Sequence, residues 1–305
     1  MAQLVPLVFG HFQIAQGIKL KALLPLLFLS TCFTAQAELI WSNKSTKGDD
    51  YLVGTIHLGD ERLLQLPQRI KSAIDAVDVV VLEIDLSELS PMERQQITFQ
   101  HGLLPSGKGL STELSPEVYQ EAKAFLANLG QDINSFERFK PWMFSIVMVE
   151  LSNNSIGLQE SRGVDKQVRD YAEARGKKIL ALESFEQQMK FFDQIIDASE
   201  KITSDDVVRD TLTELKLYKN RPLEILSSWL KGDTQMFEQV YEETLTDSEF
   251  DRVAEKILLT DRNIDWQSQL DPLLKEEKVL VAVGSLHFAG PHSLLKLLED
   301  KFIQE

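Results

Sequence analysis

YLVGTIHLGD, residues 51–60, is a short apolar run that ends in a Gly-x-x-His motif followed by a second glycine. The same pattern returns near the other end of the chain as VLVAVGSLHFAG, residues 279–290. Both runs are aliphatic and β-branched, so each is typical of a buried strand that ends at its glycine. The glycine lets the backbone turn tightly, and each histidine falls on the first loop past its strand. In open α/β sheets, ligands bind at that edge.

A strand–helix–strand unit includes the first motif. Apolar positions at helical spacing over residues 67–77 predict a helix, and the continuously apolar run DVVVLEID, residues 78–85, predicts a strand buried on both faces. Glu83 lies at the end of that strand, and Asp85 follows on the same face. We therefore expect His57 and Glu83 at the carboxyl ends of neighbouring strands, close enough to share a ligand.

The rest of the chain continues this alternation of strands and helices. Residues 38–41 and 51–54 predict a hairpin, and KILALE, residues 178–183, predicts a further strand that ends at Glu183. The stretches at about 86–160 and 186–270 have helical periodicity instead. The expected fold is α/β, with a mixed central β-sheet flanked by helices and with helical insertions between strands. Residues 38–305 are expected to form a single domain.

The first 37 residues have the pattern of an export signal. They contain no acidic residue, carry Lys19 and Lys21 before an apolar core, and end in Ala-Gln-Ala at Ala37. This pattern is typical of a signal peptide at residues 1–37, and its apolar core is shorter than the roughly 20 residues of a membrane span. We expect an exported protein, periplasmic or secreted, without a stable membrane span after cleavage. An uncleaved N-terminal membrane anchor is the alternative.

Composition excludes several classes of function. The chain has 32 basic and 47 acidic residues, a net charge of −15, which argues against a nucleic-acid partner because such proteins need a basic surface. The single cysteine, Cys32, falls within the predicted signal peptide, so disulfides and a cysteine nucleophile are excluded from the mature chain.

The polar residues at the strand ends suggest a metal site. His57, Glu83 and His287 offer two imidazoles and a carboxylate, a ligand set for a divalent transition metal with open positions for water and substrate. Such a metal lowers the pKa of its bound water, while a second carboxylate such as Glu183 moves the proton. The chain has neither a His-Glu-x-x-His nor a Gly-x-Ser-x-Gly motif, so this interpretation depends on the predicted fold.

A family resemblance extends this interpretation over nearly the whole mature chain, from about residue 39 to the C-terminus. The sequence resembles the TraB/PrgY/GumN family, which includes the Tiki proteases, in the segments GTIH (54–57), VLEID (81–85), GVD (163–165), LES (182–184), RN (262–263) and GSLH (284–287). The resemblance implies a fold related to erythromycin esterases and haem-binding ChaN-like proteins. It also implies a manganese- or cobalt-dependent metalloprotease, with zinc as an alternative metal and a peptide or protein as substrate.

The resemblance implies metal-ligand roles for the two histidines, His57 and His287; their alternative is a structural role, bonded to loop backbone. Glu83 is expected to be the third ligand or a general base, or else to cap a helix. Asp85 would replace it as ligand if Glu83 faced away. Glu183 is expected either to carry a proton or to orient a histidine.

Arg262 has two alternative roles in the same scheme. It would bind a substrate carboxylate or a developing oxyanion, or it would brace the site through a salt bridge to Glu183, Glu83 or Asp165. Asp165 and Asn263 are expected to support the site from outside, with Asp165 as the N-cap of its helix.

Three classes of function therefore remain open. The first is a metal-dependent hydrolase, a peptidase acting outside the cytoplasm. The second is a peptide- or haem-binding protein that uses the same cleft without turnover. The third is a metal-independent hydrolase of the erythromycin-esterase type, in which a histidine activates water directly. The sequence leaves the substrate, the metal used in the cell and the oligomeric state undetermined.

Overall fold

A six-stranded mixed sheet organises one half of the molecule in the computed structural model, which describes residues 38–45, 48–245, 248–299 and 301–305. The predicted signal peptide lies outside the described residues. The strand order is β4-β3-β5-β2-β1-β6. The first four of these strands run parallel, whereas β1 and β6 pair antiparallel at one side. The strands are β1 (Ile40–Ser45), β2 (Gly48–Thr55), β3 (Val79–Leu82), β4 (Lys178–Ala181), β5 (Val279–Gly284) and β6 (Ile303–Gln304). The predicted α/β fold with a mixed sheet, including the first hairpin, is confirmed.

The two most apolar strands, β3 and β5, lie next to each other inside the sheet. Every residue of β3 is buried, and all of β5 is buried except its last residue, Gly284. A strand inside the sheet is covered on both faces, which favours continuous aliphatic runs. Because β5 lies between β2 and β3, His57 and Glu83 do not follow neighbouring strands, and that expectation is wrong. His287, which follows β5, therefore comes between them.

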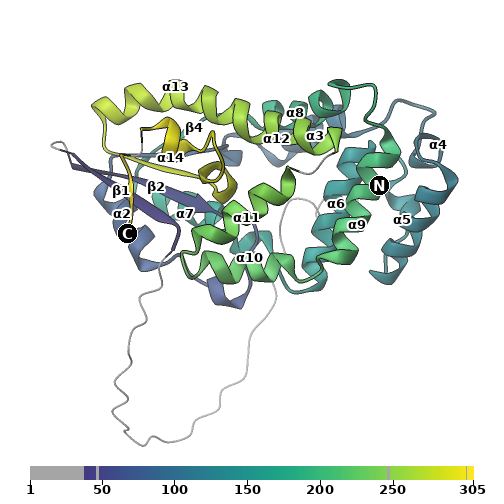
Figure 1. The fold of residues 1–305 in the computed structure, drawn as a ribbon, viewed down its shortest axis with the longest axis horizontal. Coiled ribbons are helices and arrows are strands. Elements are labelled where there is room, and N and C mark those ends of the chain that lie inside the picture. Colours follow the sequence, from purple (N-terminus) through teal and green to yellow (C-terminus); the bar gives the residue numbers. More distant parts are fainter. Residues whose placement is uncertain (1–37, 46–47, 246–247, 300) are drawn as a thin grey trace, which may run out of the picture.

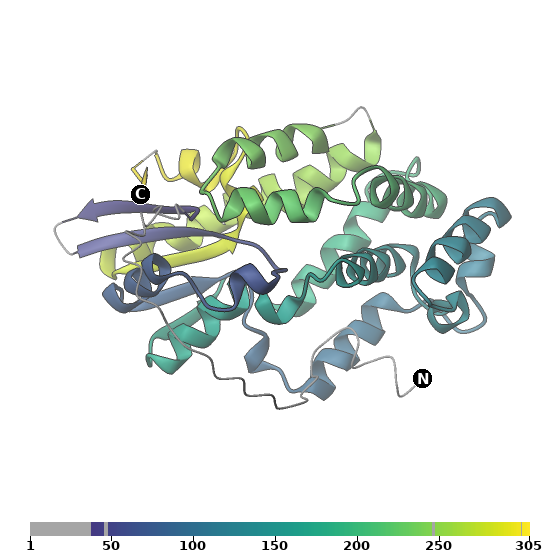
Figure 2. The same cartoon turned by 90° about the horizontal axis from the view of Figure 1, so that it is seen from below.

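Helices cover both faces of the sheet. In Figure 1 and Figure 2, α2 (Gln68–Ala76) and α7 (Val164–Ala174) lie on one face, while α13 (Asp261–Glu276), with α14 (Leu294–Leu297) beside it, lies on the other. α2 buries Ile70, Ala73 and Ile74, the i, i+3, i+4 spacing of an amphipathic helix. The helix predicted from residues 67–77 is thus confirmed.

Helices also fill the two segments expected as insertions. The first contains α3 (Pro91–Gly102), α4 (Leu110–Glu113), α5 (Pro116–Asn128) and α6 (Pro141–Ser155). The second contains α8 (Phe185–Asp197), α9 (Ser204–Leu217), α10 (Arg221–Trp229), α11 (Thr234–Thr244), α12 (Glu249–Glu255) and the π-helical turn η5 (Lys256–Thr260), which leads into α13. Short 3-10 turns are η1 (Glu61–Leu63), η2 (Leu86–Glu88), η3 (Ile133–Phe136), η4 (Glu160–Arg162) and η6 (Ser285–Phe288). Within the described ranges, we find no helix with the length and apolar character that crossing a membrane requires.

Local sequence explains where several of these helices begin. The Ser90 side chain accepts from the backbone N–H of Glu93, whose carboxylate accepts from the N–H of Ser90 in return. Ser184 and Gln187 form the same reciprocal pair at the start of α8. These capping boxes satisfy backbone donors that an α-helix leaves unpaired at its N-terminus. α8 therefore starts at Phe185, only four residues after β4 ends at Ala181.

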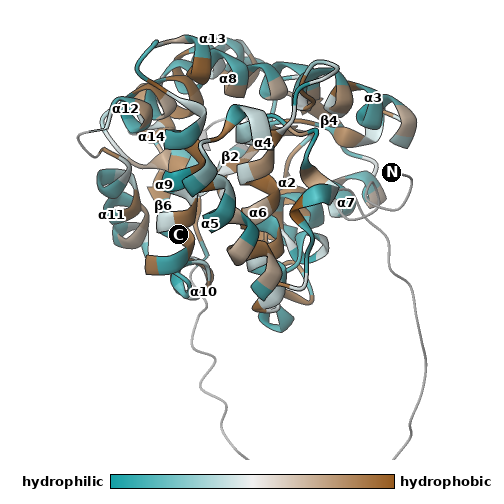
Figure 3. Ribbon diagram, turned by 90° about the vertical axis from the view of Figure 1, so that its right-hand side faces the viewer, coloured by the Kyte–Doolittle hydropathy of each residue, from teal (hydrophilic) through white to brown (hydrophobic). Residues whose placement is uncertain are grey.

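The two helical segments pack on each other and form a second hydrophobic core, separate from the core around the sheet. It includes Phe144 and Met148 from α6 and Val208 and Leu212 from α9, all fully buried. These helices form the right-hand part of Figure 1. Figure 3 shows hydrophobic and hydrophilic residues alternating around them, as expected for amphipathic helices with one buried side.

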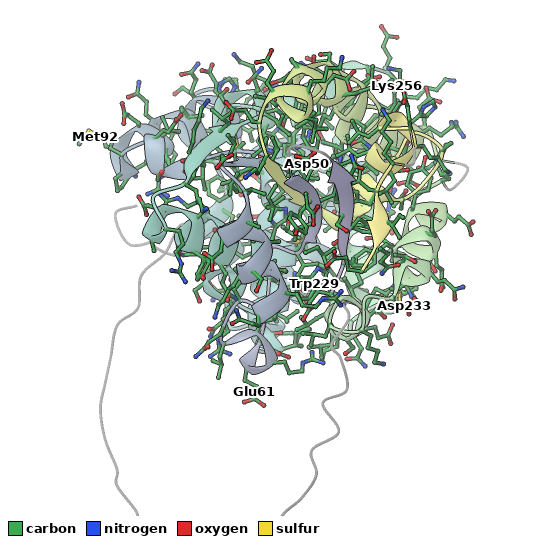
Figure 4. All side chains as sticks on the ribbon, turned by 90° about the vertical axis from the view of Figure 1, so that its left-hand side faces the viewer. Asp50, Glu61, Met92, Trp229, Asp233 and Lys256 are labelled. Carbon is green, nitrogen blue, oxygen red and sulfur yellow. The ribbon has the colours of Figure 1, made fainter. Side chains whose placement is uncertain are left out.

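Two buried side chains fix β2 within the sheet core. Near its start, Asp50 accepts a hydrogen bond from the backbone N–H of Val279 at 3.0 Å, which joins β2 to β5. Near its end, Trp229 of α10 donates from Nε1 to the carbonyl of Gly54 at 2.6 Å. Trp229 is fully buried and lies within the ribbon in Figure 4, whereas Glu61 projects from it. The loop that carries His57 thus starts from a fixed strand end.

Candidate functional site

A cavity of about 620 Å³ lies at the carboxyl edge of the parallel strands. The ends of β2, β3 and β5 supply His57, Glu83 and His287 to its lining, and α13 supplies Arg262. Helices α8, α10, α11 and α12 supply its other walls. The structure therefore brings together four of the five predicted site residues where parallel strand ends place ligands. Glu183, the fifth, lies behind this surface, buried against Arg262.

His57 presents its ring at the cavity, and its side chain is 68% exposed. Its Nδ1 lies 3.1 Å from Oδ2 of Asp165. A carboxylate only accepts, so Nδ1 carries a proton, and in the neutral ring the Nε2 lone pair is the one available to a ligand. The charge and hydrogen bond of Asp165 raise the pKa of His57 to about 9. The pair has the arrangement of an oriented imidazole base.

The Gly163-Val164-Asp165 motif builds this pair. A Cβ on Gly163 would lie 2.3 Å from the carbonyl oxygen of His57, so only glycine allows the two loops to approach this closely. The N–H of Val164 donates to the carbonyl of Ile56 at 2.8 Å. The N-cap of α7 is Gly163, and Asp165 lies in the first turn. The interpretation of Asp165 as an N-cap is therefore wrong: its carboxylate holds His57 instead.

Arg262 joins the carboxylates of Glu83 and Glu183. Its Nη2 donates to Glu83 at 2.7 Å and to Glu183 at 2.9 Å, and its Nε donates to Glu183 at 2.9 Å. Its Nη1 donates to the Leu258 carbonyl at 3.0 Å and lies 3.3 Å from Nε2 of His287. All five N–H bonds of the guanidinium thus have protein partners. Of the two roles considered for Arg262, the geometry matches the brace.

Trp266 and Gln188 complete this network. The Trp266 ring lies 4.5 Å from the Arg262 guanidinium carbon, and its Nε1 donates to Glu183 at 2.9 Å. Gln188 donates from Nε2 to Glu83 at 3.3 Å and to Glu183 at 3.2 Å. Neither was predicted as a site residue. The only sequence signal for Trp266 is its i+4 spacing from Arg262 on one helix, and Gln188 has no motif of its own.

His287 is held as a neutral imidazole. Its Nδ1 lies 2.6 Å from Oδ1 of Asn263, whose Nδ2 donates to the carbonyls of His287 and His292 at 3.2 and 2.9 Å. Nδ1 is therefore the donor, and Nε2 accepts from Arg262, which has no acceptor to offer. Burial, together with the charge of Arg262, lowers the pKa of His287 to about 3 even though Glu83 opposes the shift. The predicted supporting role of Asn263 agrees with these contacts.

Glu83 is an ionised carboxylate inside the protein. Burial alone would favour its neutral form, but His287, Arg262, His57 and the N–H of Gly284, at 2.6 Å from Oε1, outweigh burial and hold its pKa at about 2. Since His287 is neutral near pH 7, the cations that act on Glu83 there are Arg262 and the protonated form of His57. A Cβ on Gly284 would lie 3.1 Å from the same oxygen, a tight contact that favours glycine in the second Gly-x-x-His motif.

Asp85, the alternative ligand, is outside the group that lines the cavity. Its carboxylate accepts from the hydroxyl of Ser87 at 2.6 Å and from Arg169 at 3.3 Å, and it caps the turn η2. The expectation that Asp85 could replace Glu83 is therefore wrong, because the strand β3 ends at Leu82 and the chain has turned before Asp85.

The π-helical turn η5 directs Arg262 toward the strand ends. At its end the N–H of Asp261 donates to the carbonyl of Lys256, five residues earlier. The wider turn shifts the face on which the following side chains lie, a feature frequent at functional sites. It also places the Leu258 carbonyl where the Nη1 of Arg262 can reach it.

The fit of these side chains to a metal ion is incomplete. Within the described residues, no group of three histidine, cysteine, aspartate or glutamate side chains could hold a metal ion. Two of the predicted ligands come close, since Nε2 of His287 lies 3.8 Å from Oε1 of Glu83 and an ion about 2.1 Å from each could span that distance. The Arg262 guanidinium contacts both His287 and Glu83, so the arrangement suits a guanidinium better than a metal ion. The metal site stays a prediction.

Comparison with known proteins confirms the family resemblance. The sequence profile described as the TraB/PrgY/gumN family matches residues 39–304. The chain belongs to this family. It is 25% identical over 248 residues to the protein named YbaP of Escherichia coli strain K12, which covers 81% of this chain and 87% of that one. A Treponema pallidum protein is 22% identical over 309 residues, 92% of this chain and 90% of the relative. Both relatives are described as uncharacterized, and no solved structure matches the chain.

Proposed function

We propose that this protein is a hydrolase in which His57, oriented by Asp165, activates water in the cavity. The observation that carries the proposal is the His57–Asp165 pair: an exposed imidazole with its Nδ1 fixed at 3.1 Å by a carboxylate and its ring at the cavity. An oriented base beside a cavity is the usual arrangement of a general-base catalyst. Of the classes left open by the sequence, a histidine-dependent hydrolase is supported best.

The chemistry assigned to the pair follows from its geometry. Nε2 of His57 takes a proton from water as the water oxygen attacks a substrate carbonyl carbon. Asp165 keeps the proton on Nδ1 and stabilises the imidazolium that forms, as a carboxylate does for any catalytic histidine. When the tetrahedral intermediate breaks down, the same Nε2 returns the proton to the leaving oxygen or nitrogen. The Glu83–Arg262–Glu183 network keeps the strand ends in place, since Arg262 has no N–H left for substrate.

A metal-dependent peptidase is the second candidate. Its support is the 3.8 Å separation between Nε2 of His287 and Oε1 of Glu83, together with the resemblance to the Tiki proteases. There His57, Glu83 and His287 would hold a divalent ion such as Mn²⁺, Co²⁺ or Zn²⁺, which would supply an activated water. As part of this second candidate, we also propose that the chain cleaves peptides and that it is exported.

Hydrolysis of ester, amide and peptide substrates by the purified chain, with and without EDTA, tests these candidates. His57→Gln should lower the rate by about 10²–10⁴-fold, the typical contribution of a general base. Asp165→Asn should also lower it, because the imidazole then loses its fixed tautomer. His292→Gln is the matched control, because His292 is exposed and only its backbone carbonyl contacts the site; its rate should be unchanged.

The outcomes separate the candidates. Activity that is insensitive to EDTA and lost in His57→Gln supports direct activation of water. Activity lost with EDTA and restored by Mn²⁺ or Co²⁺ refutes that route in favour of the metal-dependent peptidase. Absence of hydrolysis of every substrate under both conditions refutes both and favours a binding protein.

A further inference from the structure

The wall of the cavity opposite the strand ends is made of hydrophobic side chains. These side chains come from helices α8, α10 and α11 and from the η5 turn. They include Phe191, Phe192, Ile225, Val240, Leu258 and Leu259. The cavity volume of about 620 Å³ falls within the roughly 300–1,000 Å³ of pockets that enclose small organic ligands. It is therefore much larger than a water molecule and a carbonyl group require. A ligand that fills it gains most of its affinity from burying apolar surface.

The charged side chains of the cavity are already paired with protein groups. Arg262 is neutralised by Glu83 and Glu183, and His57 lies against Asp165. Glu255, the other acidic residue in the lining, accepts from Tyr241 and Thr260 at 2.9 and 2.8 Å. The lining, as described, thus offers no uncompensated cation to a carboxylate or phosphate. A ligand with an anionic head would lose its hydration without gaining a partner.

We propose that the substrate of this site is an amphipathic ester or amide. Its large apolar acyl or alkyl group would lie among α8, α10 and α11, and its uncharged ester or amide would lie at His57. This inference rests on the proposed hydrolase function and specifies its substrate class. Because the apolar walls and the reacting groups belong to different elements, binding of the apolar group can be measured without turnover.

A series of N-alkyl acetamides, from ethyl to dodecyl, titrated into the purified chain by calorimetry tests the apolar wall. The acetamide stands in for the neutral head. Each added methylene that enters the cavity should tighten binding by about fourfold, until the cavity is filled. Alkanoates of matched length should bind more than tenfold more weakly than the amides. Equal affinity across chain lengths, or alkanoates that bind as tightly as the amides, would overturn the proposal.

Variants that fill the cavity locate the apolar group. Val240→Trp on α11 and Leu259→Trp in η5 should each weaken binding of the decyl amide by more than tenfold. Glu242→Trp, on the exposed side of α11, is the matched control and should bind like the unchanged chain. Circular dichroism checks that each variant is folded. The two positions lie on different elements, so the test still stands if one of the two variants fails to fold. Decyl-amide affinities equal to that of Glu242→Trp in both filled variants would overturn the assignment.

Turnover of p-nitrophenyl esters from acetate to dodecanoate separates this inference from the proposed function. Values of kcat/KM that rise with acyl length support both. Binding that depends on chain length without any hydrolysis refutes the hydrolase while it supports the ligand class. Hydrolysis that is fastest for acetate, with no gain from longer chains, supports the hydrolase and overturns the inference.

Discussion

Replacement of Arg262 by methionine should strongly destabilise the protein near neutral pH. Arg262 lies between the carboxylates of Glu83 and Glu183, and the side chains of the three residues are only 10%, 13% and 4% exposed. Methionine fills much of the space of the arginine stem but leaves two buried carboxylates facing each other. Removal of one partner from a buried ion pair typically costs about 3–5 kcal/mol, because the remaining charge is uncompensated.

The pKa of Glu83 gives a second route to the magnitude. Its folded pKa of about 2 lies well below the ordinary value of 4.5, and the difference corresponds to about 3 kcal/mol. Since the folded pKa is lowered, this stabilisation is present above pH 4.5 and is lost as the pH falls toward 2. Arg262 accounts for part of this shift, together with His57 and the N–H of Gly284, so Arg262→Met should cost up to about 3 kcal/mol at pH 7.

The dependence on pH should reverse in the variant. Without Arg262, two carboxylates in one buried site favour the protonated form, so the folded pKa of the pair rises above the unfolded value. The variant should therefore lose stability as the pH rises above about 4.5, and should approach the stability of the unchanged chain only toward pH 2, where Glu83 is protonated in both. Urea denaturation followed by tryptophan fluorescence at pH 4.5, 6 and 8 measures this directly, because Trp266 contacts the network.

Two further variants make the test specific. Arg262→Met combined with Glu183→Gln should recover part of the lost stability at pH 8, because one of the two opposed charges is gone. Arg209→Met, at an exposed site that also faces an acidic residue, should change stability by less than about 0.5 kcal/mol. A loss below about 1 kcal/mol in Arg262→Met, equal at pH 4.5 and pH 8, would refute the electrostatic account of the brace.

Three other predictions follow from the site and its supports. The rate of hydrolysis should rise with pH between about 6.5 and 9, because Asp165 raises the pKa of His57 and only the neutral imidazole accepts a proton. Asp165→Asn should move the midpoint of the pH–rate profile down toward about 6.5. Gly163→Ala should lower the free energy of unfolding by about 1–3 kcal/mol and lower activity, because its Cβ would press on the backbone of the His57 loop; thermal unfolding and the ester assay measure the two effects. Trp229→Phe should cost about 1–3 kcal/mol in urea denaturation, because the Gly54 carbonyl loses its donor inside the core.

The sequence predicted the convergence of His57, Glu83 and His287 because each one follows an apolar run that ends at the same edge of a parallel sheet. Backbone hydrogen bonds fix that geometry: in a parallel sheet, aligned strands deliver their carboxyl ends to one side. Glu183 was also found from the end of its predicted strand, whereas Arg262 was found through the family resemblance. The order of the strands was not predicted, since the runs of β2, β3 and β5 are similar in length and apolar character. For this reason the expectation that β2 and β3 would be neighbours was wrong.

Which helices form the far wall of the cavity could not be predicted from the sequence, for a different physical reason. α8 and α11, which line this wall, are separated by many residues, and each shows in its own sequence which side it buries, but not which element it packs against. Apolar burial is non-directional, so any two hydrophobic helix faces of suitable shape can cover each other. Strand ends place the reacting groups through directional hydrogen bonds, whereas helix packing shapes the space for the rest of the ligand. The positions of most candidate reacting groups could therefore be inferred from motifs in this chain, while the proposed preference for an apolar substrate could be inferred only from the folded structure.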